Sequence, residues 1–182
     1  MTSLRFKLRG ARLGLVAAAA MIVASCGAIS REPPGPCPRV SIVSDASQVT
    51  QFRDGPGEDL IDILFNADIT RIDMSCTYNR AGTEVDSTSS IRMLLARGPA
   101  SNITEATVTF FVAVVDENQV VIGRERFTST FVLERAQRRS GVVEEIAQII
   151  PMPPGLTGAN YEILIGFEMT DAQLAYNRRQ QN

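Results

Sequence analysis

The chain has 182 residues, with 18 lysine and arginine against 20 aspartate and glutamate residues and a formal net charge of −2. It contains no histidine, which excludes a Ser-His-Asp or Cys-His catalytic arrangement and a histidine-rich metal centre. Hydrophobic residues make up 45% of the sequence and charged residues 21%, a balance typical of a globular protein. We therefore expect a folded domain that is not an enzyme, with no catalytic residues, no cofactor and no metal site.

The N-terminus begins with basic residues and continues into a short apolar run. Four arginine and lysine residues precede residue 13, and residues 13–24 are almost entirely apolar. This run is too short for a transmembrane helix, which needs about 20 apolar residues. Its length matches the hydrophobic region of a secretory signal peptide. The sequence therefore predicts export from the cytoplasm.

The apolar run ends in Val23-Ala24-Ser25-Cys26, which resembles the lipobox of bacterial envelope lipoproteins. The resemblance implies that residues 1–25 are removed as a signal peptide and that Cys26 carries the lipid that anchors the protein to a membrane. Two or more acyl chains make such an anchor stable. Gly27, in place of an aspartate, implies sorting to the outer membrane, with the domain facing the periplasm. The alternative is an ordinary signal peptide in which Cys26 is incidental.

Residues 26–38 are predicted to form a proline-rich tether, since Pro33, Pro34, Pro36 and Pro38 favour extended polyproline geometry. The steps from Cys26 to the next cysteine would reach about 35 Å at ~3.1 Å per residue. Without residues 1–25, 20 acidic residues stand against 14 basic ones, a net charge of −6. This charge argues against nucleic acid as a partner.

Cys37 and Cys76 are the other two cysteines. In an oxidising envelope compartment they are most simply a disulfide, which would stabilise the fold by about 4 kcal/mol on the chain-entropy model. Metal binding is the rival interpretation, but two cysteines without histidine cannot complete a usual zinc site. Unpaired thiols in the core are the other alternative.

The next part of the chain predicts long strands. Apolar residues alternate on odd numbers from Ile61 to Ile69 and on even numbers from Ile72 to Tyr78, so we expect a strand with a bulge near Thr70. A polar strand follows and ends at residues 91–96. A hairpin is then predicted, with strands at residues 108–115 and 120–133, a turn at 116–119 and a bulge at Gly123.

The C-terminal third predicts two more strands and a helix. Residues 142–150 suit either a helix face or a strand, and their β-branching favours a strand. A final strand is expected from Tyr161 to Met169. Thr170 and Gln173 can cap a short helix carrying Leu174 and Tyr176. We expect this helix to close one end of the fold, with a role of Leu174 and Tyr176 in binding a partner as the alternative.

Seven or eight such strands predict an all-β fold, an antiparallel β-sandwich of immunoglobulin or fibronectin type with a short C-terminal helix. A closed barrel is the main alternative. The expected organisation is a signal peptide at 1–25, a tether at 26–38, a sandwich domain at 39–170 and a helix and tail at 171–182.

Three charged clusters have weaker functional signals. Residues 54–59 gather three carboxylates without the ligand spacing of a calcium loop, so a plain turn is favoured. Glu144 and Glu145 are adjacent, and adjacent strand residues point to opposite faces, so we interpret them as solvent-exposed charge rather than a catalytic pair. Arg135, Arg138 and Arg139 form a basic cluster that suits a solvated loop better than a site for lipid phosphates.

The sequence therefore predicts a lipid-anchored outer-membrane protein that acts as a non-enzymatic protein-binding or structural module, for example in outer-membrane assembly or maintenance. The expected partners are the membrane, through Cys26, and another envelope protein. The alternative is a ligand-binding module for a glycan, lipid or small solute. The whole chain also looks like small uncharacterised lipoproteins of diderm bacteria, a resemblance that assigns no functional residue.

Overall fold

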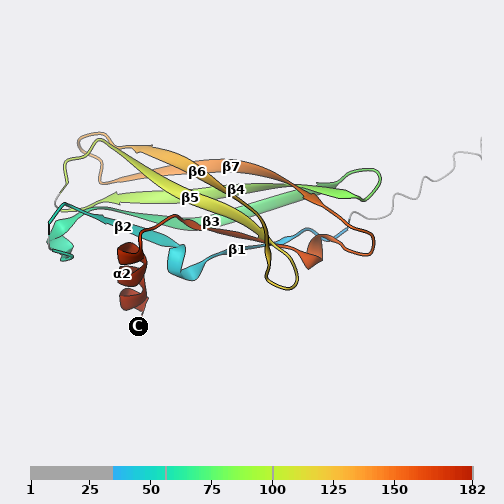
Figure 1. Ribbon diagram of the computed structural model, residues 1–182. Coiled ribbons are helices and arrows are strands. Elements are labelled where there is room, and N and C mark those ends of the chain that lie inside the picture. The colour runs from blue at the N-terminus through green and yellow to red at the C-terminus, as the bar shows by residue number, and fades with distance from the viewer. Residues whose placement is uncertain (1–34, 56, 100, 182) are drawn as a thin grey trace, which may run out of the picture. The chain divides into compact units, whose positions relative to one another are not determined.

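The computed structural model describes residues 35–55, 57–99 and 101–181. The predicted signal peptide, Cys26 and most of the predicted tether lie outside the described residues. Alternating apolar residues on long strands leave each sheet with one face that must be buried, and here two four-stranded sheets bury these faces against each other (Figure 1). Sheet A has the strand order β1 (Arg39–Ile42), β8 (Glu162–Phe167), β5 (Glu105–Val115) and β6 (Val121–Val132). Sheet B has the order β2 (Gln48–Phe52), β3 (Ile63–Tyr78), β4 (Glu84–Arg97) and β7 (Arg139–Pro151).

The chain crosses between the sheets several times. β3 and β4 form a hairpin in sheet B, and β5 and β6 form a hairpin in sheet A. β7 then returns to sheet B beside β4, and β8 returns to sheet A beside β5. All these pairs are antiparallel, as is β2 with β3, whereas β1 and β8 are parallel.

The predicted β-sandwich is confirmed, and the described residues form eight strands and a C-terminal helix, α2 (Asp171–Gln181). It shares its architecture with immunoglobulin and fibronectin domains, a group in which strand connections vary. As one example of its own connections, this chain has β3 and β4, consecutive strands, hydrogen-bonded to each other in the same sheet. Residues 142–150, for which the sequence left helix and strand open and favoured a strand, lie in β7. Among the described residues, no helix has the length and apolar character needed to cross a bilayer.

Both predicted bulges are confirmed. In β3, Ile69 pairs with Met93 and Arg71 with Arg92, so Thr70 is the extra residue and the core-facing positions change from odd to even. In β6, the register shifts beside Gly123, where the extra residue is Ile122.

Some predicted strand boundaries are wrong. The final strand, expected from Tyr161 to Met169, spans only Glu162–Phe167. Ile61 does not belong to β3 but to η3 (Leu60–Asp62), a short 3-10 turn, and its side chain is 66% exposed. The turn forms because the Asp62 amide donates to the Asp59 carbonyl at 2.9 Å, while the Asp62 carboxylate pairs with Arg53. Because of these local bonds, β3 begins at Ile63, two residues later than predicted.

The core lies between the sheets and draws on both. Its fully buried side chains include Phe110, Phe131, Phe167, Ile91, Met93 and Leu95. Phe110 stacks on Phe127 of the neighbouring strand, with ring centroids 5.5 Å apart. Because full burial of one such side chain contributes about 1.5–3 kcal/mol, this core is the main source of stability.

Candidate functional site

The edges of the two sheets differ in how they are covered. Sheet B ends at β2 on one side and at β7 on the other, and sheet A ends at β1 and β6. An uncovered edge strand presents unpaired main-chain groups that can bind another strand. The covering of each edge therefore decides where this domain can accept a partner.

Helix α2 covers the β2 edge (Figure 1). Asn177, only 5% exposed, donates from Nδ2 to the carbonyl oxygens of Gln48 at 2.6 Å and Asp45 at 2.9 Å. One turn earlier, Gln173 donates to the Thr50 carbonyl oxygen at 3.4 Å. The helix begins as predicted, because the Thr170 amide donates to the Gln173 side chain and the Gln173 amide donates to the Thr170 hydroxyl.

The two predicted partner-binding residues lie on this helix and are half-buried. Tyr176 packs edge-on against Phe52 of β2, with ring centroids 5.0 Å apart. Leu174 faces a groove between α2, the turn η2 (Ser44–Ala46) and sheet A. Both side chains thus contribute to holding the helix on the sandwich, and Leu174 is also accessible from the groove.

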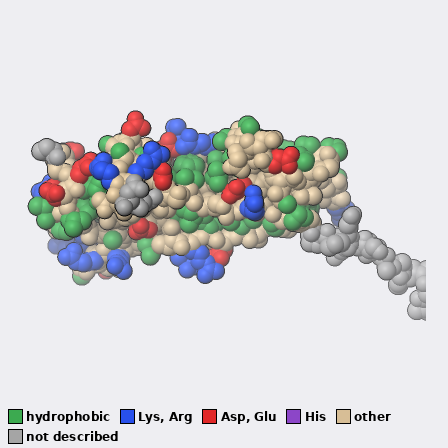
Figure 2. All heavy atoms as spheres, turned by 90° about the horizontal axis from the view of Figure 1, so that it is seen from below, with side chains coloured by type: hydrophobic (Ala, Val, Ile, Leu, Met, Phe, Trp, Pro, Cys, Tyr) green, Lys and Arg blue, Asp and Glu red, His purple; other side chains and the backbone are tan. Residues whose placement is uncertain are grey.

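The groove has a volume of about 270 Å³, and its lining is mixed. Arg124 lies over the Phe111 ring, 4.5 Å from its centroid, and donates to Glu168 at 2.7 Å. Arg178 donates to Asp45 at 2.8 Å. Each arginine in the groove is therefore already paired with a carboxylate. Figure 2 shows the face that carries α2, on which side chains of both charges are interspersed among small hydrophobic areas.

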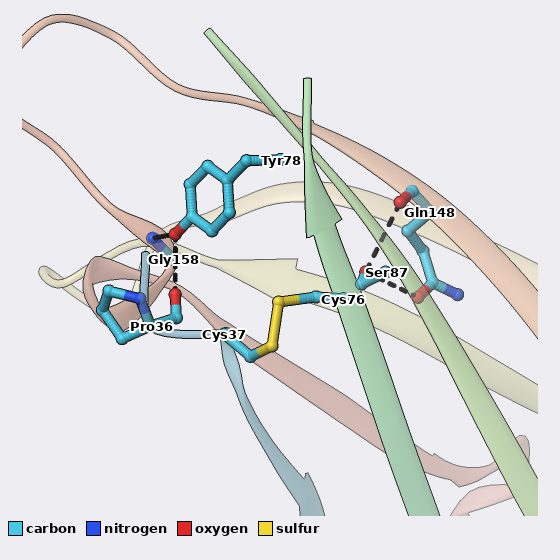
Figure 3. Close-up of a disulfide and its surroundings, with 7 residues drawn as sticks. All are labelled: Pro36, Cys37, Cys76, Tyr78, Ser87, Gln148 and Gly158. Atoms are coloured by element: carbon cyan, nitrogen blue, oxygen red, sulfur yellow. Dashed lines mark hydrogen bonds between the residues drawn. A yellow bond between two sulfur atoms is a disulfide. The ribbon is translucent and has the colours of Figure 1, made fainter. Parts of the chain in front are cut away.

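The end of the predicted tether is fixed to the sandwich. Cys37 and Cys76 form the predicted disulfide, with Cα atoms 5.7 Å apart, and join the segment before β1 to β3 (Figure 3). Beside it, the Tyr78 hydroxyl donates to the Pro36 carbonyl oxygen and accepts from the Gly158 amide, both at 2.7 Å. Glycine is required at position 158, because a Cβ atom there would clash with the Pro36 carbonyl oxygen. Any chain preceding Pro36 therefore leaves from a rigid point.

The β6 and β7 edges form what we call the open side. Within the described part of the chain, no strand or helix pairs with their outer edges. β6 is exposed on both faces from Val121 to Arg126, and β7 exposes Val143 by 53% and Ile149 by 68%. The open side thus combines two long strands with large apolar side chains in solvent.

A polar seam runs between the two sheets along the open side. The Ser129 hydroxyl of β6 donates to Glu144 of β7 at 2.6 Å. Ser87 contacts both the main chain and the side chain of Gln148 at 3.4–3.5 Å (Figure 3). The Ser89 hydroxyl and the Gln148 side-chain nitrogen are buried without a partner in the described chain. Buried polar atoms without partners are uncommon, and each calls for an explanation such as an ordered water molecule, an ion or a partner.

Glu144 differs from the expectation for solvent-exposed charge. The prediction that the adjacent glutamates point to opposite faces is confirmed, since Glu145 is exposed and Glu144 is half-buried. Glu144 faces the seam because it occupies a core-facing position of β7, opposite Ile91 of β4. Its carboxylate can lie there because the Ser129 hydroxyl supplies a hydrogen bond.

The turn before β6 is held by Asp116. Its carboxylate accepts hydrogen bonds from the amides of Asn118 and Val120, both at 2.9 Å. These bonds, the one from Val120 foremost, hold the pKa of Asp116 below its ordinary value. Gln119 completes the turn with a positive φ of 63°. The carboxylate therefore fixes the point from which the β6 edge starts.

The remaining charged clusters act locally in the fold. In the loop of residues 54–59, Glu58 pairs with Arg179 of α2. Arg135 and Arg138 are exposed in the loop before β7, and their main-chain oxygens accept hydrogen bonds from Arg97. Arg139 is also exposed, at the first position of β7. Over the described ranges, no group of three or more histidine, cysteine, aspartate or glutamate residues is placed to hold a metal ion.

Comparisons with known proteins assign no family. No protein-family model matches the chain, and no curated protein matches it. Among solved structures, the variable (V) domain of the Streptococcus agalactiae AgI/II polypeptide BspA covers 94% of this chain and 93% of its own, with 10% identity and a TM-score of 0.19. A TM-score this low carries no argument about fold or function.

The open side was not among the residues that the sequence singled out. Residues 142–150 were predicted as a strand from their β-branching, and that pattern does not specify that Val143 and Ile149 would be exposed. A signal was present, however. A strand with apolar residues at both odd and even positions near each of its ends must expose some of them unless both faces are covered.

Proposed function

We propose that this chain is a lipid-anchored envelope protein whose β-sandwich acts as a non-enzymatic protein-binding or structural module, for example in outer-membrane assembly or maintenance. The observation that carries the proposal is the open side. β6 and β7, of 12 and 13 residues, end their sheets with exposed apolar side chains. Such edges bind extended segments of other proteins through main-chain hydrogen bonds, while side chains provide specificity.

The tether junction supports the anchoring part of the proposal. The lipobox-like residues before Cys26 would place a lipid ahead of the proline-rich segment. The disulfide and the Tyr78 hydroxyl hold the end of that segment on the sandwich. A domain attached in this way would stay close to the membrane while its open side faced other envelope proteins.

The groove beside α2 gives less support to the alternative, a module for a small ligand. Pockets for such ligands typically have volumes of about 300–1,000 Å³ and a few polar groups that are free to orient the ligand. The groove is smaller, at about 270 Å³, and Arg124 and Arg178 are engaged by Glu168 and Asp45. We therefore place binding at the open side.

Chemical cross-linking of intact envelopes followed by purification of the full chain tests this proposal. We expect reproducible protein partners, and we expect charged substitutions of exposed residues on β6 and β7 to reduce their recovery. A matched substitution of Leu60, which is 74% exposed on η3, should leave recovery unchanged. Co-purification of a small molecule from the α2 groove, with no protein partner, would contradict the proposal and favour the ligand-binding module.

A further inference from the structure

The sequence of β7 is nearly symmetric about its centre, Ile146. Moving outward from Ile146, the chain has a small or charged residue, then a polar one, and then two apolar ones on each side. The four symmetric pairs are Glu145 and Ala147, Glu144 and Gln148, Val143 and Ile149, and Val142 and Ile150. A strand with this pattern can pair antiparallel with a copy of itself so that apolar residues lie opposite apolar residues.

From this pattern we infer that two copies of the chain pair through their β7 edges, antiparallel, about a two-fold axis at Ile146. In this register Val143 of one copy lies opposite Ile149 of the other on the outer face of sheet B. These two side chains are 53% and 68% exposed in the single chain. Directly opposite residues have Cβ atoms about 4.5–5.5 Å apart, so the pairing would bury both. The inference rests on the proposed function, because it names the partner at the open side.

Neighbouring registers are disfavoured by charge. Centring the pair on Glu145 places two like carboxylates directly opposite each other, which is destabilising. Centring it on Ala147 places Glu145 opposite Ile149 and Glu144 opposite Ile150, which desolvates carboxylates against apolar side chains. The Ile146 register avoids both problems, and the nearest alternatives do not.

The same register satisfies a buried donor. The Gln148 side-chain nitrogen is buried without a partner in the described chain. In the proposed pair, Gln148 lies opposite Glu144 of the second copy, on the same face of the sheet. The Glu144 carboxylate receives its hydrogen bond from Ser129 on Oε1, and this bond does not use Oε2. A change of the Gln148 side-chain conformation on pairing would give its nitrogen this charged acceptor.

β6 is compatible with the same axis. The hydrogen bond between Ser129 and Glu144 joins the two edges. Counting two residues back along β6 and two forward along β7 from this bond, we take Phe127 and Ile146 as the matching centres. Self-pairing of β6 centred on Phe127 puts Ile122 opposite Val132, both exposed apolar residues, and Arg126 opposite Thr128. One two-fold axis thus brings both edges of the open side together without opposing like charges.

Cysteine cross-linking of the full chain in its native envelope tests the register. The double variant V143C/I149C should form a disulfide-linked dimer under mild oxidation. In the proposed register, the cysteine at position 143 of one copy lies opposite the cysteine at position 149 of the other. Either single variant should remain monomeric, since equivalent residues would lie about 20 Å apart, six residues at ~3.4 Å each. The unsubstituted chain, with its native Cys37–Cys76 disulfide, is the control for background oxidation.

A charge exchange on the purified full chain gives an independent test. Val143→Lys or Ile149→Glu alone should raise the dimer dissociation constant about tenfold or more, since two symmetric apolar pairs are lost at once. The double variant V143K/I149E should recover most of the affinity, because each lysine then faces a glutamate. Leu60→Glu, at a more exposed apolar position away from β7, should leave the constant unchanged. Sedimentation velocity over a concentration series measures the dimer dissociation constants of these four variants.

The results separate this inference from the proposed function. A cross-linked dimer specific to V143C/I149C, together with rescue by the charge exchange, supports pairing of two copies through β7. A double-cysteine variant that stays monomeric, or single variants that cross-link equally well, overturns it. If partner recovery from envelopes persists while the chain stays monomeric, the proposed function stands and the second copy is the wrong partner.

Discussion

One buried side chain, Asn177, makes the shortest hydrogen bond between α2 and β2, and its removal has a calculable cost. Asn177→Ala deletes the hydrogen bonds from Nδ2 to the Gln48 and Asp45 carbonyl oxygens, at 2.6 and 2.9 Å. Each is worth about 1 kcal/mol net, and alanine returns about 0.5 kcal/mol through its higher helix propensity. We therefore expect the free energy of unfolding to fall by about 1.5 kcal/mol.

Urea denaturation of the full chain measures this change, with Gln180→Ala, an exposed position on the same helix, as the control. Amide hydrogen exchange should also accelerate in α2 and β2 while the central strands keep their protection. A loss of stability no larger than that of Gln180→Ala, with unchanged exchange in β2, would refute the argument that Asn177 holds the helix over this edge.

Three further predictions concern the tether junction and the start of β6. Replacing Cys37 and Cys76 together by serine should lower the free energy of unfolding by up to about 4 kcal/mol, because the disulfide closes a long loop in the unfolded chain; denaturation curves that coincide with the parent's would contradict this. Tyr78→Phe should cost about 1–3 kcal/mol, since the lost hydroxyl serves two main-chain groups, and urea denaturation would show it. The pKa of Asp116 is lowered in the folded state, so its stabilising effect is complete above the ordinary pKa of 3.8 and is lost as the pH falls through the folded value. Thermal unfolding followed over acid pH should therefore decline less steeply in Asp116→Ala, and an unchanged pH profile would argue against the bonds to the amides of Asn118 and Val120.

Much of the fold could be predicted from the sequence because its signals are local. The change of phase between Ile69 and Ile72 located the bulge at Thr70, since the period of two is fixed by the geometry of a strand. The disulfide between Cys37 and Cys76 followed from the small number of cysteines and the expected compartment. Ile61 was misplaced because hydrogen bonds within η3 override a pattern that continues into the turn.

The candidate site was less predictable because it depends on strand order. Val143 and Ile149 are exposed because they lie on the outer face of sheet B, and they stand beside a free edge because β7 ends that sheet; no local pattern specifies either. Likewise, the sequence placed Leu174 and Tyr176 on a helix but did not show that the helix would lie on β2. Only the pairing of strands distant in sequence distinguishes the β2 edge, which α2 covers, from the open side.

Site-specific photo-cross-linking in the native envelope tests the central claim most directly. A photoreactive amino acid at Ile149, on the open side, should form protein adducts, and the same residue at the more exposed Leu60 should not. Adducts confined to Ile149 would agree with a protein-binding module that acts through its β6 and β7 edges. Equal labelling at both positions, or none at Ile149, would contradict it.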